Sequence, residues 1–145
     1  MREGNVIALC SRIVESAHKE IVQELKNQGV GGIVPSHGGI MQVLFGGQEY
    51  TMQELARKIH RTKPTVTVLV EKLEAFGYVQ RRKSEEDGRI TLLRLTAKGQ
   101  ALESVFREIS ERVNHRVYAG LSEEEAEEVE RLLSKVKGDF CPTNG

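Results

Sequence analysis

Several residue types that often carry chemistry are scarce in this sequence. Of 145 residues none is Trp, 5% are aromatic, three are Pro and two are Cys. Cys10 and Cys141 lie near opposite ends, and the four histidines are scattered, so neither a disulfide framework nor a structural metal site is expected. No apolar run approaches the roughly 18 residues that would span a bilayer. These absences predict a cytoplasmic protein without cofactor, metal or membrane partner.

Charge is balanced in total but uneven along the chain. The sequence has 21 Lys and Arg against 21 Asp and Glu. Residues 51–100 hold eleven basic against six acidic residues, whereas residues 101–145 hold six against ten. Because phosphate responds to the local field and not to the sum, the middle third is the candidate surface for a polyanion.

Hydrophobic periodicity predicts a mainly helical chain with one β-hairpin. Apolar residues recur at three- and four-residue steps in several segments, each bounded by a capping residue or a glycine. The spacing of Thr51 and Glu54 predicts a capping box, as does that of Ser122 and Glu125. The predicted helices span about 5–28, 35–45, 51–59, 62–76, 96–119 and 122–138, with residues 139–145 as a frayed tail.

The period changes to that of strands between the fourth and fifth predicted helices. Tyr78–Lys83 and Ile90–Leu95 are short segments rich in β-branched, aromatic or leucine residues. The Asp87–Gly88 pair between them is typical of a turn with positive φ. Two short helices with a tight turn, followed by a hairpin, form a helix-turn-helix with a wing.

Such a unit places its second helix in the major groove of DNA, and its wing against phosphates or the minor groove. The outward face of the helix at 62–76 carries hydroxyls, cations and one apolar residue. Its candidate DNA-binding residues are Lys63, Pro64, Thr65, Thr67, Val68 and Lys72. The hairpin adds Arg81, Arg82, Lys83 and Arg89. Among the acidic residues 85–87, at least one is expected to pair with a nearby arginine, and Asp87 is assigned this structural role in the wing.

Residues 87–96, DGRITLLRLT, match the D-x-R-x-x-x-x-x-L-T wing motif of the MarR (multiple antibiotic resistance regulator) family. The resemblance extends over about Asn5–Lys137, and Thr65–Glu74 is similar to the family's recognition helix. It implies a homodimer that binds double-stranded DNA at a pseudo-palindromic operator, most simply as a repressor that responds to a ligand or stress. The chain is then one domain, with residues 36–96 as the winged helix-turn-helix and residues 5–28 and 97–137 as the helical dimerisation part.

The resemblance raises two further questions. Some MarR-like proteins sense hydroperoxides through a cysteine in the first helix, but Cys10 lies on the apolar stripe and no Tyr precedes Tyr50, so a structural cysteine is expected. His37 and the neighbouring glycines lie where such proteins often form a small-molecule effector pocket, but a solvent-facing histidine is at least as well supported by the sequence.

Two other functions compete with DNA-dependent regulation. A winged helix can be a protein-interaction or assembly module, which the zero net charge and the acidic last third favour. An enzyme is the least supported, because the sequence has no nucleophile elbow, phosphate-binding glycine loop or metal cluster. The hydroxyl-rich, cationic face of the fourth helix favours DNA.

Overall fold

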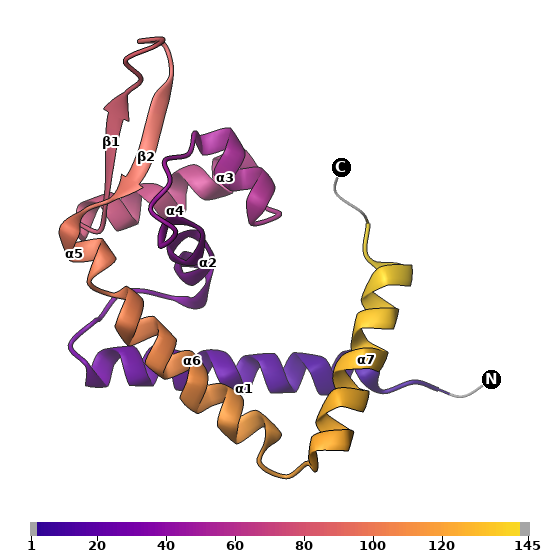
Figure 1. The fold of residues 1–145 in the computed structure, drawn as a ribbon. Helices are drawn as coiled ribbons and strands as arrows, with labels where there is room; N and C mark the ends of the chain where they lie inside the picture. The colour runs from indigo at the N-terminus through magenta and orange to yellow at the C-terminus, as the bar shows by residue number, and fades with distance from the viewer. Residues whose placement is uncertain (1–2, 143–145) are drawn as a thin grey trace. The chain divides into compact units, whose positions relative to one another are not determined.

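The computed structural model describes residues 3–142 of the chain. It forms two compact units, Met1–Ile109 and Ser110–Gly145. The elements are α1 (Val6–Asn27), α2 (Pro35–Leu44), α3 (Met52–Lys58), α4 (Lys63–Ala75), β1 (Val79–Lys83), β2 (Thr91–Leu95), α5 (Ala97–Gln100), α6 (Glu103–Tyr118) and α7 (Glu123–Phe140) (Figure 1). The mainly helical fold with one small β-hairpin is therefore confirmed.

The core of the first unit lies between α2, α3, α4 and the inner face of the hairpin. Each of these elements contributes fully buried apolar side chains, and none of those named here is more than 1% exposed: Ile40, Met41, Leu44, Leu55, Val66, Val70, Leu73 and Leu93. A buried Leu or Ile is worth about 2 kcal/mol by transfer from water. This packing fixes α4 from behind and leaves its opposite face in solvent.

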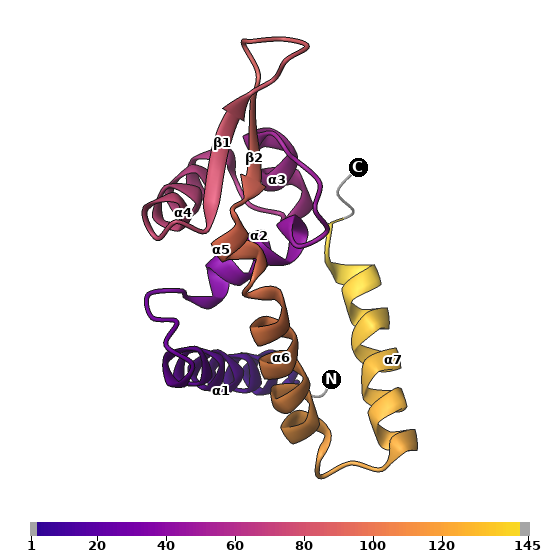
Figure 2. The same cartoon turned by 60° about the vertical axis from the view of Figure 1, so that its left-hand side comes forward.

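The hairpin is a regular antiparallel pair that projects away from α2–α4 (Figures 1 and 2). Val79 pairs with Leu95 and Lys83 with Thr91. Tyr50 adds a bridge on the other side of β2, with both backbone hydrogen bonds to Leu93 formed at 3.1 and 2.7 Å. The segment before α3 therefore holds the base of the wing.

The single long helix predicted for residues 96–119 is wrong. Thr96 does cap a helix, by accepting the Gly99 amide at 3.1 Å, but α5 ends at Gln100 and α6 begins at Glu103. The Thr96 amide donates to the Tyr78 carbonyl at 3.0 Å, and a Cβ on Gly99 would lie 2.1 Å from that same oxygen. This contact with the backbone of Tyr78, directly before β1, ties α5 to the base of the hairpin.

The outer helices also differ in detail from the prediction. The side chain of Asn5 makes no capping hydrogen bond, although α1 begins directly after it. The capping box of Ser122 and Glu125 is confirmed, with bonds of 3.0 and 3.1 Å. Helix α7 continues through Gly138 to Phe140, two residues beyond the predicted end. The last three residues of the predicted frayed tail lie outside the described part of the chain.

Helices α1 and α7 each carry an apolar stripe that is exposed within the single chain. On α1 the large apolar side chains that are 49–82% exposed are Val6, Ile7, Leu9, Ile13 and Val14. On α7 those that are 40–52% exposed are Val129, Leu132, Leu133 and Val136. Cys10, expected to be structural, is only half-buried here. Amphipathic helices of this kind need a partner surface.

His37 is the one buried polar side chain among residues 3–142, and it is 1% exposed. The prediction of a solvent-facing histidine is thus wrong. Its Nδ1 accepts the Val34 amide at 3.0 Å, which closes the first turn of α2. The proton of the neutral ring therefore sits on Nε2. Burial, with a smaller contribution from the charge of Lys72, lowers the pKa of His37 below its usual 6.5.

This geometry predicts a stability that depends on pH in a mildly acidic window. The unfolded chain binds a proton on His37 more readily than the folded chain, so the free energy of unfolding is highest above pH 6.5 and falls as the pH drops below it. We expect the Tm to fall by roughly 2–4 °C between pH 7.5 and pH 5.5. His37→Asn, whose Oδ1 can accept the same amide without titrating, should remove this fall. Thermal unfolding of both proteins at the two pH values is the measurement; equal slopes would contradict the assignment.

Candidate nucleic-acid interface

Helix α4 presents the predicted DNA-binding side chains to solvent. Thr62 caps it by accepting the Thr65 amide at 3.4 Å, and Pro64 lies in the first turn, where no amide hydrogen is needed. Of the six candidates, Thr67 is half-buried and the other five are exposed: Lys63, Pro64, Thr65, Val68 and Lys72. Leu69 of the same helix is half-buried, and its fully buried stripe consists of Val66, Val70 and Leu73.

The hydroxyls on this face already have partners within the helix. The Thr67 hydroxyl donates its hydrogen to the Lys63 carbonyl at 2.8 Å. The Thr62 hydroxyl donates to Thr65 Oγ1 at 2.9 Å. The first turn of α4 is thus stiffened by its own side chains, and Thr67 is left with lone pairs and a methyl group to offer a ligand.

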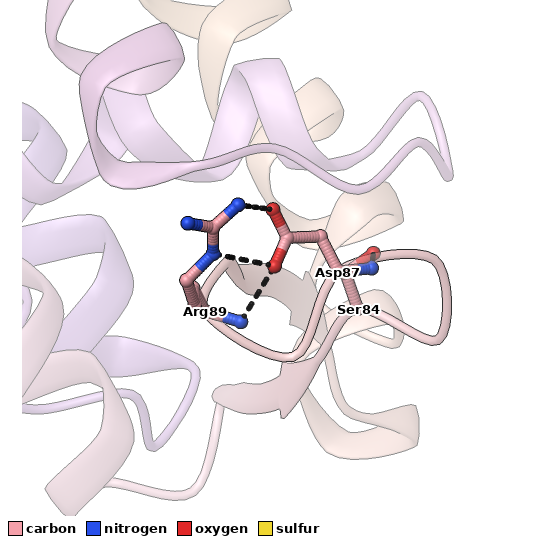
Figure 3. Close-up of polar contacts among 3 residues, drawn as sticks. All are labelled: Ser84, Asp87 and Arg89. Atoms are coloured by element: carbon pink, nitrogen blue, oxygen red, sulfur yellow. Dashed lines mark hydrogen bonds and ion pairs between the residues drawn. The ribbon is translucent and has the colours of Figure 1, made fainter.

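The tip of the wing is organised by a bidentate ion pair (Figure 3). Arg89 donates from Nε to Asp87 Oδ1 and from Nη2 to Oδ2, both at 3.1 Å, and its backbone amide also reaches Oδ1 at 3.0 Å. These bonds lower the pKa of Asp87. The Arg89 side chain remains 91% exposed. The expected pairing of an acidic wing residue with an arginine is therefore confirmed, with the cation still accessible.

The predicted positive φ at the Asp87–Gly88 turn is wrong. Gly88 is not among the residues with positive φ in the described chain. The Asp87 carboxylate instead closes the turn by accepting an amide two residues on, and the Asp87 amide donates to Ser84 Oγ at 3.4 Å. Among the non-glycine residues of the described chain, positive φ occurs at His60, with φ of 56°, in the turn between α3 and α4.

Arg81 and Arg82 point to opposite faces of the hairpin. Arg81 forms an ion pair with Glu74 of α4 at 2.7 Å. Arg82 forms a bidentate pair with Glu49, at 2.5 and 2.7 Å, which lowers the pKa of Glu49. Both arginines therefore hold the wing to the helix-turn-helix. Their direct contact with DNA stays a prediction, as does that of the exposed Lys83.

An open cleft of about 710 Å³ separates the start of α4 from the wing tip. Its walls bring together Lys63, Arg89 and a third cation, Arg57 of α3, which was not among the predicted DNA-binding residues. The other lining residues are Thr51, Met52, Gln53, Glu54, Ile90 and Thr91. The clue to Arg57 was its place on the outward side of the first helix of the motif. Three cations on both sides of one cleft suit a phosphodiester strand.

The Glu49–Arg82 pair predicts a local effect on the order of the wing. Glu49→Gln removes the charge from a contact that joins residues 33 positions apart, so we expect amide exchange within β1 to become roughly two- to fivefold faster. Glu15→Gln breaks a surface pair with Lys19 on α1 and should leave β1 unchanged. Hydrogen exchange followed by NMR at neutral pH measures both. Unchanged β1 exchange in the Glu49 variant would show that the pair does not hold the wing.

Other kinds of site find little support in residues 3–142. This part of the chain contains no group of three or more His, Cys, Asp or Glu arranged to hold a metal ion. None of its helices is both long and apolar enough to cross a membrane.

The order α2–α3–α4–β1–β2–α5, with α4 exposed beside the hairpin, defines a winged helix-turn-helix protein. Comparison with known proteins supports this class. The sequence model of the MarR family matches residues 44–91. The uncharacterized HTH-type transcriptional regulator YdgJ of Bacillus subtilis is 29% identical over 116 residues, covering 80% of this chain and 71% of YdgJ. The regulator MhqR of the same organism is 27% identical and covers 72% of each chain.

Solved structures extend the similarity to nearly the whole chain. The S. aureus MepR–DNA complex superposes with a TM-score of 0.83 at 26% identity, covering 95% of this chain and 100% of that one. A mutant MarR from E. coli complexed with operator DNA has a TM-score of 0.78 at 20% identity, covering 94% and 99%, and shows the fold alone. The chain thus has the fold of MarR-like winged helix-turn-helix proteins, and its residues 44–91 match the MarR family.

Proposed function

We propose that this protein regulates transcription by binding double-stranded DNA through one continuous surface made of α4, the cleft and the wing. The observation that carries the proposal is the cleft lined by Arg57, Lys63 and Arg89. With α4 in the major groove and Arg89 at the adjacent minor groove, the strand between the two grooves runs through this cleft. The MepR relative is seen in complex with DNA, which supports the same role here.

The protein acts as a homodimer in this proposal. Its support is the exposed apolar stripe on α1 and the second one on α7, which a second copy would cover. Residues 36–96 then serve as the DNA-binding part, and residues 5–28 and 97–137 as the dimerisation part. Two recognition helices related by a two-fold axis match a pseudo-palindromic operator, with half-sites one helical turn apart.

Regulation in this proposal is repression that a ligand or stress signal relieves. A dimer binds its operator tightly only when both recognition helices engage at once. A small effector that favours another spacing of the two helices would lower the affinity.

A titration against DNA tests this function. Binding to duplexes from the DNA upstream of its own gene and of neighbouring genes is measured by fluorescence anisotropy. The affinity of the dimer for one of these duplexes should exceed its affinity for a scrambled duplex of equal length by about 10³-fold or more. The affinity should fall steeply with added salt. Binding that shows no sequence preference on any of these duplexes would reject a specific regulator.

A further inference from the structure

Val68 stands out on the recognition helix because it is apolar and more than half exposed to solvent. It is 57% exposed, the highest value for a large apolar side chain between residues 30 and 109. The helix turns 100° per residue, so Val68 lies opposite the stripe formed by Val66, Val70 and Leu73. A valine at the centre of the outward face buries less than half of its surface in the single chain, so it contributes little to folding.

The residues around Val68 limit what this part of the face can recognise. The Thr67 hydroxyl hydrogen is held by the Lys63 carbonyl, so it is not available as a donor to a base. Glu71, one turn further on, is an exposed carboxylate that repels phosphate. Lys63, at the first position of α4, and Lys72, about one turn beyond Val68, are both exposed, and their charges suit phosphates. The middle of the face thus fits the floor of the groove, with an apolar group at its centre.

We propose that Val68 is a specificity-determining residue that contacts the 5-methyl group of a thymine in each half-site. Among the base edges of the major groove, only thymine presents a methyl group, and an apolar side chain is its natural partner. This inference rests on the proposed DNA-binding function and names one base that the protein recognises in each half-site.

The test removes one methyl group at a time from the DNA. The preferred duplex is first selected from a random library with the full-length wild-type dimer. Each thymine is then replaced by deoxyuridine, and affinities are measured by anisotropy. One position per half-site should cost the wild type about fourfold, the effect of one buried methyl group. Val68→Ala should bind the thymine duplex more weakly and lose this discrimination.

Val34→Ala is the matched control, because Val34 is 44% exposed but lies outside α4, before α2. It should retain the wild-type preference for thymine. If the wild type selects a sequence but discriminates at no thymine, or if Val68→Ala keeps the discrimination, the role of Val68 is overturned while the proposed function stands. If selection yields no preferred sequence, both are overturned.

Discussion

Replacing Arg89 with alanine should weaken operator binding by about tenfold per wing, and so by about a hundredfold for a dimer that uses both wings. The reason lies in the geometry of the wing tip. Asp87 holds the guanidinium through two 3.1 Å contacts and yet leaves it 91% exposed. The side chain is therefore oriented before DNA arrives, and the ordering cost that a mobile arginine would incur is reduced. Loss of one phosphate contact per wing should also flatten the salt dependence, by about 0.9 in log–log slope for each.

Arg131→Ala is the control for this prediction. Arg131 of α7 makes the same kind of bidentate pair, with Glu128 at 2.6 and 3.0 Å, but lies outside the wing. Its loss should leave DNA affinity unchanged. Anisotropy titrations at several salt concentrations measure both variants. Wild-type affinity and slope in the Arg89 variant would exclude the wing tip from the interface.

Gly99→Ala should destabilise the first unit by about 3 kcal/mol, lowering the Tm by roughly 10 °C. The added Cβ would lie 2.1 Å from the Tyr78 carbonyl oxygen and 3.0 Å from its carbon. Both are backbone atoms, so no side-chain rotation relieves the clash. That oxygen also accepts the Thr96 amide, so moving it disturbs the junction of β1, β2 and α5.

Gly38→Ala provides the opposite expectation within the same unit. Gly38 lies inside α2, and a Cβ there meets nothing within 4 Å. Alanine should raise the free energy of unfolding by about 0.5–1 kcal/mol, because glycine loses more backbone entropy in a helix. Urea unfolding of both variants is the measurement. A Gly99 variant as stable as the wild type would mean that α5 does not pack against β1.

Local patterns in the sequence were enough to predict the helices and the hairpin. Capping residues and three- to four-residue periodicity predict α2, α3 and α4 to within a residue or two, because both reflect contacts between near neighbours. The ion pair at the wing tip could be predicted for the same reason, since its two residues are two positions apart. The end of α5 at Gln100 was not predicted, and the close approach of Gly99 to the Tyr78 carbonyl, 21 residues earlier, is a distant contact that no local pattern displays.

The candidate site shows the same division between local and distant contacts. The sequence displays Arg82 as one of three consecutive basic residues, and nothing in that run indicates that Glu49 engages it. The sequence also suggests that α4 offers two free hydroxyls on its outer face, whereas the Thr67 hydroxyl donates to the Lys63 carbonyl and the Thr65 hydroxyl accepts from Thr62. Exposure of Lys63 and Arg89 was predicted, but the cleft that joins them to Arg57 depends on how α3 packs beside the wing.

Hydrogen exchange with and without the selected duplex tests most directly whether α4, the cleft and the wing form one DNA-binding surface. DNA should slow exchange in peptides that cover residues 51–57, 63–72 and 84–91 together, and leave peptides of α7, residues 123–140, unchanged. Slowed exchange confined to α7, or absent from both α4 and the wing, would contradict the account.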